Sequence, residues 1–198
     1  FWSDAANHQY GPILGMPPLQ ACVRQKLEKE NQIDLSGRSI VVTAGSNMGF
    51  LNLVLAITDP GDEVILLLPY FFNQEMAVRI AGCEPVLVDT DSDYQPVLNR
   101  LERAITARTR AIVTVSPNNP TGAVYAESVL REINTLCQDR GIYHLTDEAY
   151  EYFVYDGARH FSPASIRNSQ SHTISVYSLS KAYGFAGWRI GYLVAPSE

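Results

Sequence analysis

A lysine and an arginine lie close together near the end of this chain. The apolar run 173–177 leads into Ser178 and Lys181, and Arg189 follows after a short loop. A lysine amine is a nucleophile that forms Schiff bases with aldehydes, and a guanidinium binds anions such as phosphate. A lysine after a strand is most often a solvated turn residue, so a reactive lysine depends on which other side chains reach the same place.

Strands and helices alternate along most of the chain. Apolar runs rich in β-branched residues predict strands, and apolar residues at helical spacing predict helices. The predicted strands cover 40–43, 64–68, 85–89, 111–115, 142–146, 173–177 and 189–194. The predicted helices cover 17–31, 47–58, 73–81, 96–106 and 126–139. Such alternation of nearly continuous apolar strands with helices is typical of a parallel sheet that helices cover on both faces.

The last strand is expected to run the other way. Only residues 178 to 188 separate it from the preceding strand, which is shorter than the dozen or more residues that a parallel crossover needs. The sequence therefore predicts an α/β fold: a mostly parallel seven-stranded sheet with one antiparallel strand and helices on both faces.

Ligands of open α/β sheets bind beyond the carboxyl ends of the parallel strands. In this sequence the residues directly after those strands are Gly45, Ser46, Asn47, Phe71, Asn119, Asp147, Tyr150, Ser178 and Lys181. Arg189, as the first residue of an antiparallel strand, is expected at the same edge. Each residue alone has an ordinary explanation as a turn, helix cap, ion-pair partner or packing aromatic. The set is more specific than its members.

Together these side chains suit pyridoxal phosphate. N–H groups at a helix start and an arginine bind phosphate. A lysine amine reacts with the aldehyde, an acid pairs with the ring nitrogen and an aromatic ring stacks on the cofactor. The P-loop, dinucleotide-binding and G-x-S-x-G motifs are absent from the sequence.

Composition argues against several other classes of protein. The 198 residues are 46% hydrophobic, enough for one globular unit with a substantial core. The net charge is −6 and the 15 lysines and arginines are scattered, which is unlike a nucleic-acid binder. The three cysteines and four histidines are dispersed and predict no metal site, and no apolar run is long enough to cross a membrane. These features favour a cytoplasmic protein. The chain starts at Phe1 without a methionine, so we expect a piece of a longer protein.

The chain resembles fold-type I pyridoxal-phosphate enzymes of the class I/II aminotransferase family, from Tyr10 to Val194. The run from Ser178 through Lys181 and Gly184 to Arg189 and Gly191 matches the lysine signature of that family. Two further landmarks are Asn119-Pro120-Thr121-Gly122 and Asp147-Glu148-Ala149-Tyr150.

The resemblance implies a role for each residue. Lys181 would form the Schiff base and move the proton between the substrate Cα and the cofactor, and Asp147 would pair with the protonated ring nitrogen. Asn119, after which a cis bond to Pro120 is expected, and Tyr150 would hydrogen-bond the phenolic oxygen of the cofactor. Phe71 would stack on the ring. The phosphate would lie at the helix start, held by Gly45, Ser46, Asn47, Ser178 and Arg189.

The resemblance also implies a homodimer, in which Tyr10 reaches the phosphate of the neighbouring subunit. Residues 1–198 would be the cofactor-binding large domain with part of the N-terminal segment. The small C-terminal domain, which supplies the arginine for the substrate carboxylate in that family, would lie outside this sequence.

The implied activity is transfer of an amino group from an L-amino acid to a 2-oxo acid. A carbon-sulfur lyase or a cyclopropane-forming synthase of the same family is the enzymatic alternative, because the course of the reaction depends on residues outside this sequence. An aminotransferase-like effector domain of a transcription regulator is a third interpretation. The intact lysine signature and the acidic pI favour the enzyme.

Overall fold

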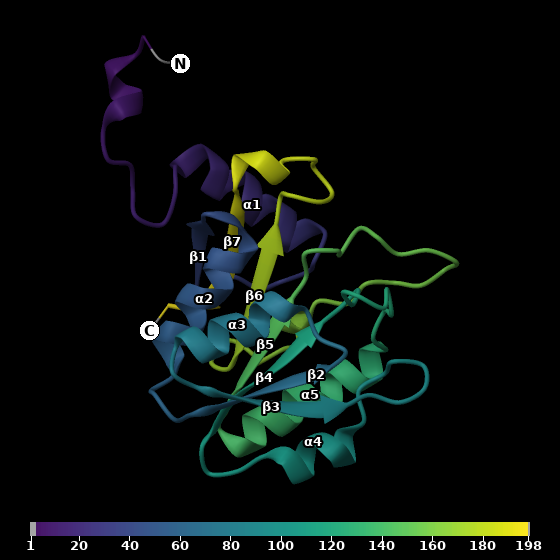
Figure 1. Cartoon of the computed structure of the whole chain (residues 1–198). Coiled ribbons are helices and arrows are strands. Elements are labelled where there is room, and N and C mark those ends of the chain that lie inside the picture. Colours follow the sequence, from purple (N-terminus) through teal and green to yellow (C-terminus); the bar gives the residue numbers. More distant parts are fainter. Residues whose placement is uncertain (1–2, 198) are drawn as a thin grey trace.

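A single seven-stranded sheet organises the chain (Figure 1). The computed structural model describes residues 3–197. The strands are β1 (Arg38–Thr43), β2 (Glu63–Leu68), β3 (Glu84–Asp89), β4 (Thr109–Val115), β5 (Tyr143–Asp147), β6 (Thr173–Ser178) and β7 (Gly191–Pro196). The α-helices are α1 (Pro17–Lys29), α2 (Gly45–Ile57), α3 (Phe72–Ile80), α4 (Leu98–Ala104) and α5 (Glu127–Arg140). The described residues also form three short 3-10 helices: η1 (Ala5–His8) before α1, η2 (Pro163–Ser165) between β5 and β6, and η3 (Ala186–Trp188) between β6 and β7.

The strand order is β1-β7-β6-β5-β4-β2-β3. Strands β2 to β6 pair in parallel where they are neighbours. β7 lies antiparallel between β1 and β6, with Gly191 opposite both Thr43 and Ser178. The predicted fold class is therefore confirmed, including the reversed last strand.

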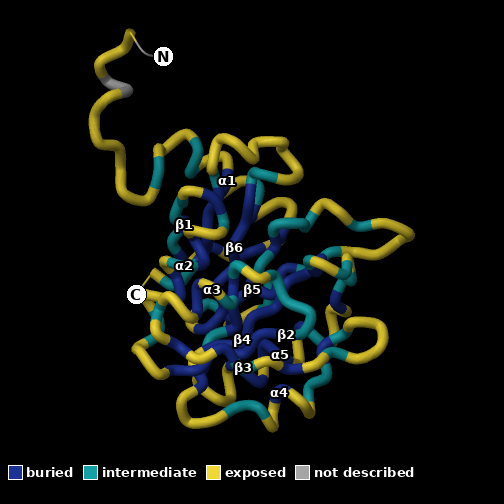
Figure 2. Tube along the Cα trace, viewed as in Figure 1, coloured by how far each residue is buried: buried dark blue, intermediate teal, exposed yellow. Residues whose placement is uncertain are grey.

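Helices cover both faces of the sheet, because successive side chains of the buried strands point to opposite sides. In β2, Val64 and Leu66 pack with α2 and α3, whereas Ile65 and Leu67 pack with α4 and α5 on the other face. α1 packs against the β6–β7 end of the second face, where Leu27 belongs to the same buried cluster as Tyr177. The sheet strands consequently form the buried centre of the molecule (Figure 2).

Several predicted boundaries were wrong by one or two residues, and two have clear causes. The predicted helix 96–106 is only Leu98–Ala104 long, because Ile105 is extended and Thr106 instead donates a 2.6 Å hydrogen bond to the buried Glu63. The predicted strand 189–194 begins at Gly191, because Arg189 ends η3 in a left-handed conformation with φ 52°. A left-handed residue cannot continue a strand.

The segment before α1 extends away from the sheet (Figure 1). Its last part is fixed to β1, since the Val42 N–H donates to the Leu14 carbonyl at 3.0 Å. Tyr10 further out is fully exposed. Within residues 3–197, no helix has the length and apolar character that a bilayer span requires.

Candidate active site

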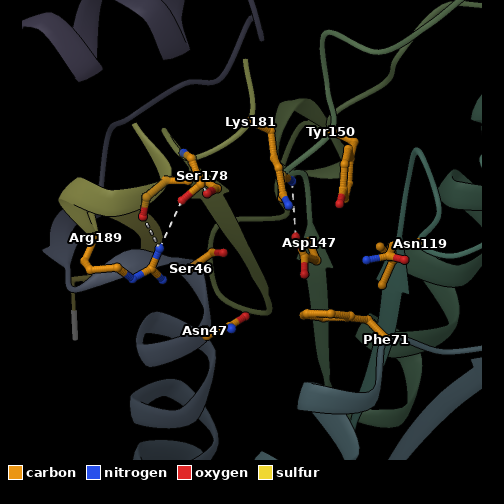
Figure 3. Close-up of a pocket in the computed structure, with 13 residues that line it drawn as sticks. Ser46, Asn47, Phe71, Asn119, Asp147, Tyr150, Ser178, Lys181 and Arg189 are labelled. Carbon is orange, nitrogen blue, oxygen red and sulfur yellow. Dashed lines mark hydrogen bonds between the residues drawn. The ribbon is translucent and has the colours of Figure 1, made fainter. Parts of the chain in front are cut away.

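A cavity of about 170 Å³ opens at the carboxyl edge of the parallel strands (Figure 3). Its lining residues are Ser46, Asn47, Phe71, Val115, Asn119, Asp147, Ala149, Tyr150, Ser178, Ser180, Lys181, Ala186 and Arg189. Nine of these are residues that the sequence singled out, and they come from segments far apart in the chain. Of the remaining two predicted residues, Gly45 lies against the rim beside Arg189, and Tyr10 does not line the cavity.

The N-terminus of α2 forms one wall of the cavity and faces Arg189. Gly45 has φ +81°, and a Cβ added to it would lie 2.2 Å from Nη2 of Arg189. A Cβ on Gly191 would lie 2.5 Å from the backbone nitrogen of Ser46. Glycine at both positions therefore lets the helix start approach both the guanidinium and β7. The first N–H groups of a helix have no partner within the helix and attract anions.

Arg189 is held in place by its own loop. Its Nη1 donates to the Ala186 carbonyl at 2.8 Å and to Oγ of Ser180 at 3.3 Å. The prediction that Arg189 lies at this edge was right, although the residue precedes β7 and is not its first residue. Ser180 was absent from the predicted set. Its place in the run from Ser178 to Lys181 was the available signal.

Asp147 ends β5 on the floor of the cavity, and each of its carboxylate oxygens accepts one hydrogen bond. Oδ1 accepts from the backbone N–H of Ala149 at 3.1 Å, and Oδ2 accepts from Nε2 of Gln74 at 3.0 Å. Burial raises the pKa of Asp147 to about 6, because desolvation penalises the charged form more than these two hydrogen bonds favour it. At neutral pH the Asp147 carboxyl is therefore mostly ionised, and a nearby positive charge would lower its pKa toward the ordinary value.

Lys181 and Tyr150 point into the cavity from neighbouring loops (Figure 3). The Lys181 Nζ lies 5.4 Å from the centre of the Tyr150 ring. The Phe71 ring lies across the other side of the cavity, where α3 begins. The cavity thus has an amine and a phenol facing an aromatic plane.

Asn119 is presented by a tight turn after β4. The Asn119–Pro120 bond is cis, as predicted. The neighbouring Asn118 holds the turn, since its Oδ1 accepts from the N–H and the hydroxyl of Thr121 at 3.1 and 2.8 Å. This turn directs the Asn119 side chain toward the cavity.

The segment after β5 contains a partly buried polar cluster that the sequence did not predict. Possible ligand atoms of Glu148, Glu151 and His160 lie within 4.8 Å of one another. These carboxylates already have partners: Glu148 accepts from His160 at 2.8 Å, and Glu151 from Lys26 at 2.5 Å. The cluster is therefore a hydrogen-bond network that includes the Lys26–Glu151 ion pair, and it fixes the loop after β5.

Comparison with known proteins agrees with this geometry. A model of the family "Aminotransferase class I and II" matches residues 3–198. A probable aspartate/prephenate aminotransferase of Thermus aquaticus is 43% identical over 95% of this chain and 49% of its own length. An aromatic aminotransferase of Arabidopsis thaliana is 37% identical over 96% of this chain and 48% of its own length. The chain thus spans about half the length of the curated relatives it matches.

Solved structures show the same fold. An aspartate aminotransferase of Thermus thermophilus, a double mutant, superimposes with a TM-score of 0.89 at 41% identity, covering 95% of this chain and 49% of that one. An aromatic aminotransferase of Pyrococcus horikoshii has a TM-score of 0.91 at 37% identity, covering 96% and 52%. The cavity, the sheet and these relatives lead to one conclusion: the chain belongs to the class I and II aminotransferase family.

Proposed function

We propose that this chain is the cofactor-binding large domain of an aminotransferase that moves an amino group from an L-amino acid to a 2-oxo acid. The observation that carries the proposal is the arrangement of Lys181, Asp147 and Arg189 around one cavity. The loop between β6 and β7 supplies the amine and the guanidinium, and the end of β5 supplies the acid. The names of the relatives support the reaction class.

The residues of the cavity fit pyridoxal phosphate, the cofactor of this family. The cofactor supplies an aldehyde for amines and a positively charged ring that withdraws electrons. The free N–H groups at the start of α2 and the guanidinium of Arg189 suit its phosphate, together with the hydroxyls of Ser46 and Ser178. The buried carboxylate of Asp147 accepts hydrogen bonds from two neutral donors, Ala149 and Gln74, so a cationic ring nitrogen would stabilise its charge and lower its pKa.

Each side chain then has a defined task. Lys181 offers an amine for covalent attachment and for proton transfer at the substrate Cα. Asp147 would hold the proton on the ring nitrogen through its negative charge. Asn119 and Tyr150 would donate hydrogen bonds to the phenolic oxygen, and Phe71 would pack against the ring and exclude water from it.

Covalent labelling tests the assignment of Lys181. In the full-length protein, borohydride reduction of the cofactor-loaded enzyme should fix the cofactor to Lys181, because this amine lines the cavity. Peptide mapping by mass spectrometry measures the position of the label. The exposed Lys29 on α1 is the internal control and should stay unmodified. Label on a different lysine would sink the assignment.

We further propose a cytoplasmic homodimer whose sites are shared between subunits. The unpaired state of the three cysteines supports a reducing compartment. The segment around Tyr10 supports the dimer, since it extends away from the sheet and its tyrosine side chain is fully exposed. A symmetric pair would exchange this segment twice in an isologous interface.

Hybrid dimers test the sharing of sites. Lys181→Ala subunits are mixed with Tyr10→Phe subunits, each variant first shown to have low activity alone. If Tyr10 acts across the interface, both lesions fall in one site and the other site is wild type, so hybrid activity should recover to about half. If Tyr10 acts within its own subunit, each site carries one lesion and no recovery is seen. Sedimentation as a monomer would also contradict the proposal.

A further inference from the structure

Gln74 is a buried polar residue that the proposed chemistry does not use. It lies in the first turn of α3, two residues after Phe72, and only 2% of it is exposed. Its backbone N–H bonds to the Phe71 carbonyl at 2.9 Å, and its Nε2 donates to Oδ2 of Asp147 at 3.0 Å. A buried amide in a helix that packs on an apolar sheet is costly unless it has a partner. Here that partner is a residue of the cavity.

The direction of this hydrogen bond follows from chemistry. An ionised carboxylate only accepts hydrogen bonds, so the NH₂ side of the amide must face it. With Ala149 bonded to Oδ1 and Gln74 to Oδ2, both oxygens are anchored and rotation of the carboxylate is restricted. Both donors also favour the charged form, against the effect of burial. Because an amide does not titrate, the support from Gln74 is the same at every physiological pH.

We propose that Gln74 is a positioning residue, which orients the Asp147 carboxylate toward the ring nitrogen of the cofactor and keeps that carboxylate ionised. The inference rests on the proposed function, since it needs Asp147 to act on the cofactor. It also connects two parts of the site. One turn of α3 supplies both the aromatic ring of Phe71 and the donor to the acid.

The test uses the full-length protein and the variant Gln74→Met, which keeps the length of the side chain and removes the N–H donor. Gln74→Leu is made in parallel, so that a folding defect of one variant does not stop the test. Met76→Leu, at an exposed position of the same helix, is the matched control. The probe is pyridoxal phosphate, and its dissociation constant is measured by equilibrium dialysis from pH 5 to pH 9.

Loss of the donor should weaken cofactor binding about tenfold at pH 7.5, since hydrogen bonds to charged groups are the stronger ones. As the pH falls, the dissociation constant should rise once Asp147 takes up a proton. The pH at which this rise begins should be higher in Gln74→Met than in the wild type. The ionisations of the cofactor itself are the same for all variants. The other titratable or charged groups near Asp147 are unchanged as well: Glu148, Tyr150, Lys181, Arg189 and, on α3, Glu75 and Arg79.

A double-mutant cycle with Asp147→Asn separates positioning from packing. If Gln74 acts through Asp147, Gln74→Met should change the dissociation constant by less than about twofold in the Asp147→Asn background. The inference would be overturned if Gln74→Met weakened cofactor binding equally in the wild-type and Asp147→Asn backgrounds. It would also be overturned if the dissociation constant of Gln74→Met alone were within about twofold of the wild-type value. Borohydride labelling of Lys181 in the wild type tests the proposed function separately. Label on Lys181 together with an unchanged Gln74 variant refutes only the role of Gln74.

Discussion

Replacement of Lys181 by alanine should lower the rate of transamination by about 10⁴-fold or more. A positioned acid–base group contributes up to about 10⁴-fold in rate, and Lys181 is proposed to serve as the covalent attachment point as well. The measurement is single-turnover conversion of an L-amino acid by the full-length variant loaded with cofactor. Lys29→Ala, on the exposed side of α1, is the matched control and should keep the wild-type rate.

Cofactor retention distinguishes a chemical lesion from an empty site. The Lys181→Ala variant keeps Arg189 and the start of α2, so it should still bind pyridoxal phosphate without a covalent bond. Equilibrium dialysis measures this binding. A variant that binds the cofactor and retains more than about a hundredth of the activity would contradict the role of Lys181, because a positioned acid–base group contributes at least about a hundredfold in rate.

The change Asp147→Asn should slow transamination on the order of a thousandfold and leave the fold intact. Opposite unit charges about 4 Å apart interact by roughly 4 kcal/mol at an effective dielectric near 20, and about 1.36 kcal/mol corresponds to one decade in rate. The asparagine is isosteric and still accepts from Ala149. The exposed Asp93 provides the control, Asp93→Asn. A rate within about threefold of wild type refutes the role of Asp147.

The stability of the cofactor-free protein should depend on pH because of the Asp147 carboxyl. The pKa of Asp147 is about 6 in the folded state and 3.8 in the reference state, because burial disfavours its charge. Between these values the folded protein binds a proton that the unfolded protein has lost. The contribution of Asp147 to the free energy of unfolding is therefore fully present below about pH 4, and it is lost as the pH rises through about 6. In urea unfolding, the free energy of unfolding should fall more between pH 4 and pH 6 for the wild type than for Asp147→Asn, which lacks the titrating carboxyl.

The sequence was most informative where one physical rule determines position. Parallel strands end at one edge of a sheet, and this rule alone brought Ser46, Asn119, Asp147 and Lys181 together. The short connection before the last strand correctly predicted its reversal. The roles of these residues stay predictions until the labelling and mutational experiments are done.

Other features lay beyond local sequence patterns. Nothing in the sequence distinguishes Gln74 from a solvent-exposed helix residue, because its partner Asp147 is distant in the chain. The left-handed conformation of Arg189 was missed for a similar reason, since it depends on contacts with Ser180 and Ala186 that form only in the folded loop. Polar contacts that form only on folding decide these details, and local propensity does not contain them.

Because β7 runs antiparallel to β6, a single loop determines the spacing between Lys181 and Arg189. Lys181 and Arg189 both belong to the connection between Ser178 and Gly191, which face each other in neighbouring strands. The base of this loop is closed by a 3.1 Å hydrogen bond from the Leu179 N–H to the Ile190 carbonyl. The spacing between the reactive amine and the guanidinium is thus set by the length of a single segment with fixed ends. Many surface loops tolerate insertions during evolution. An insertion between Lys181 and Arg189 would instead move the amine relative to the guanidinium.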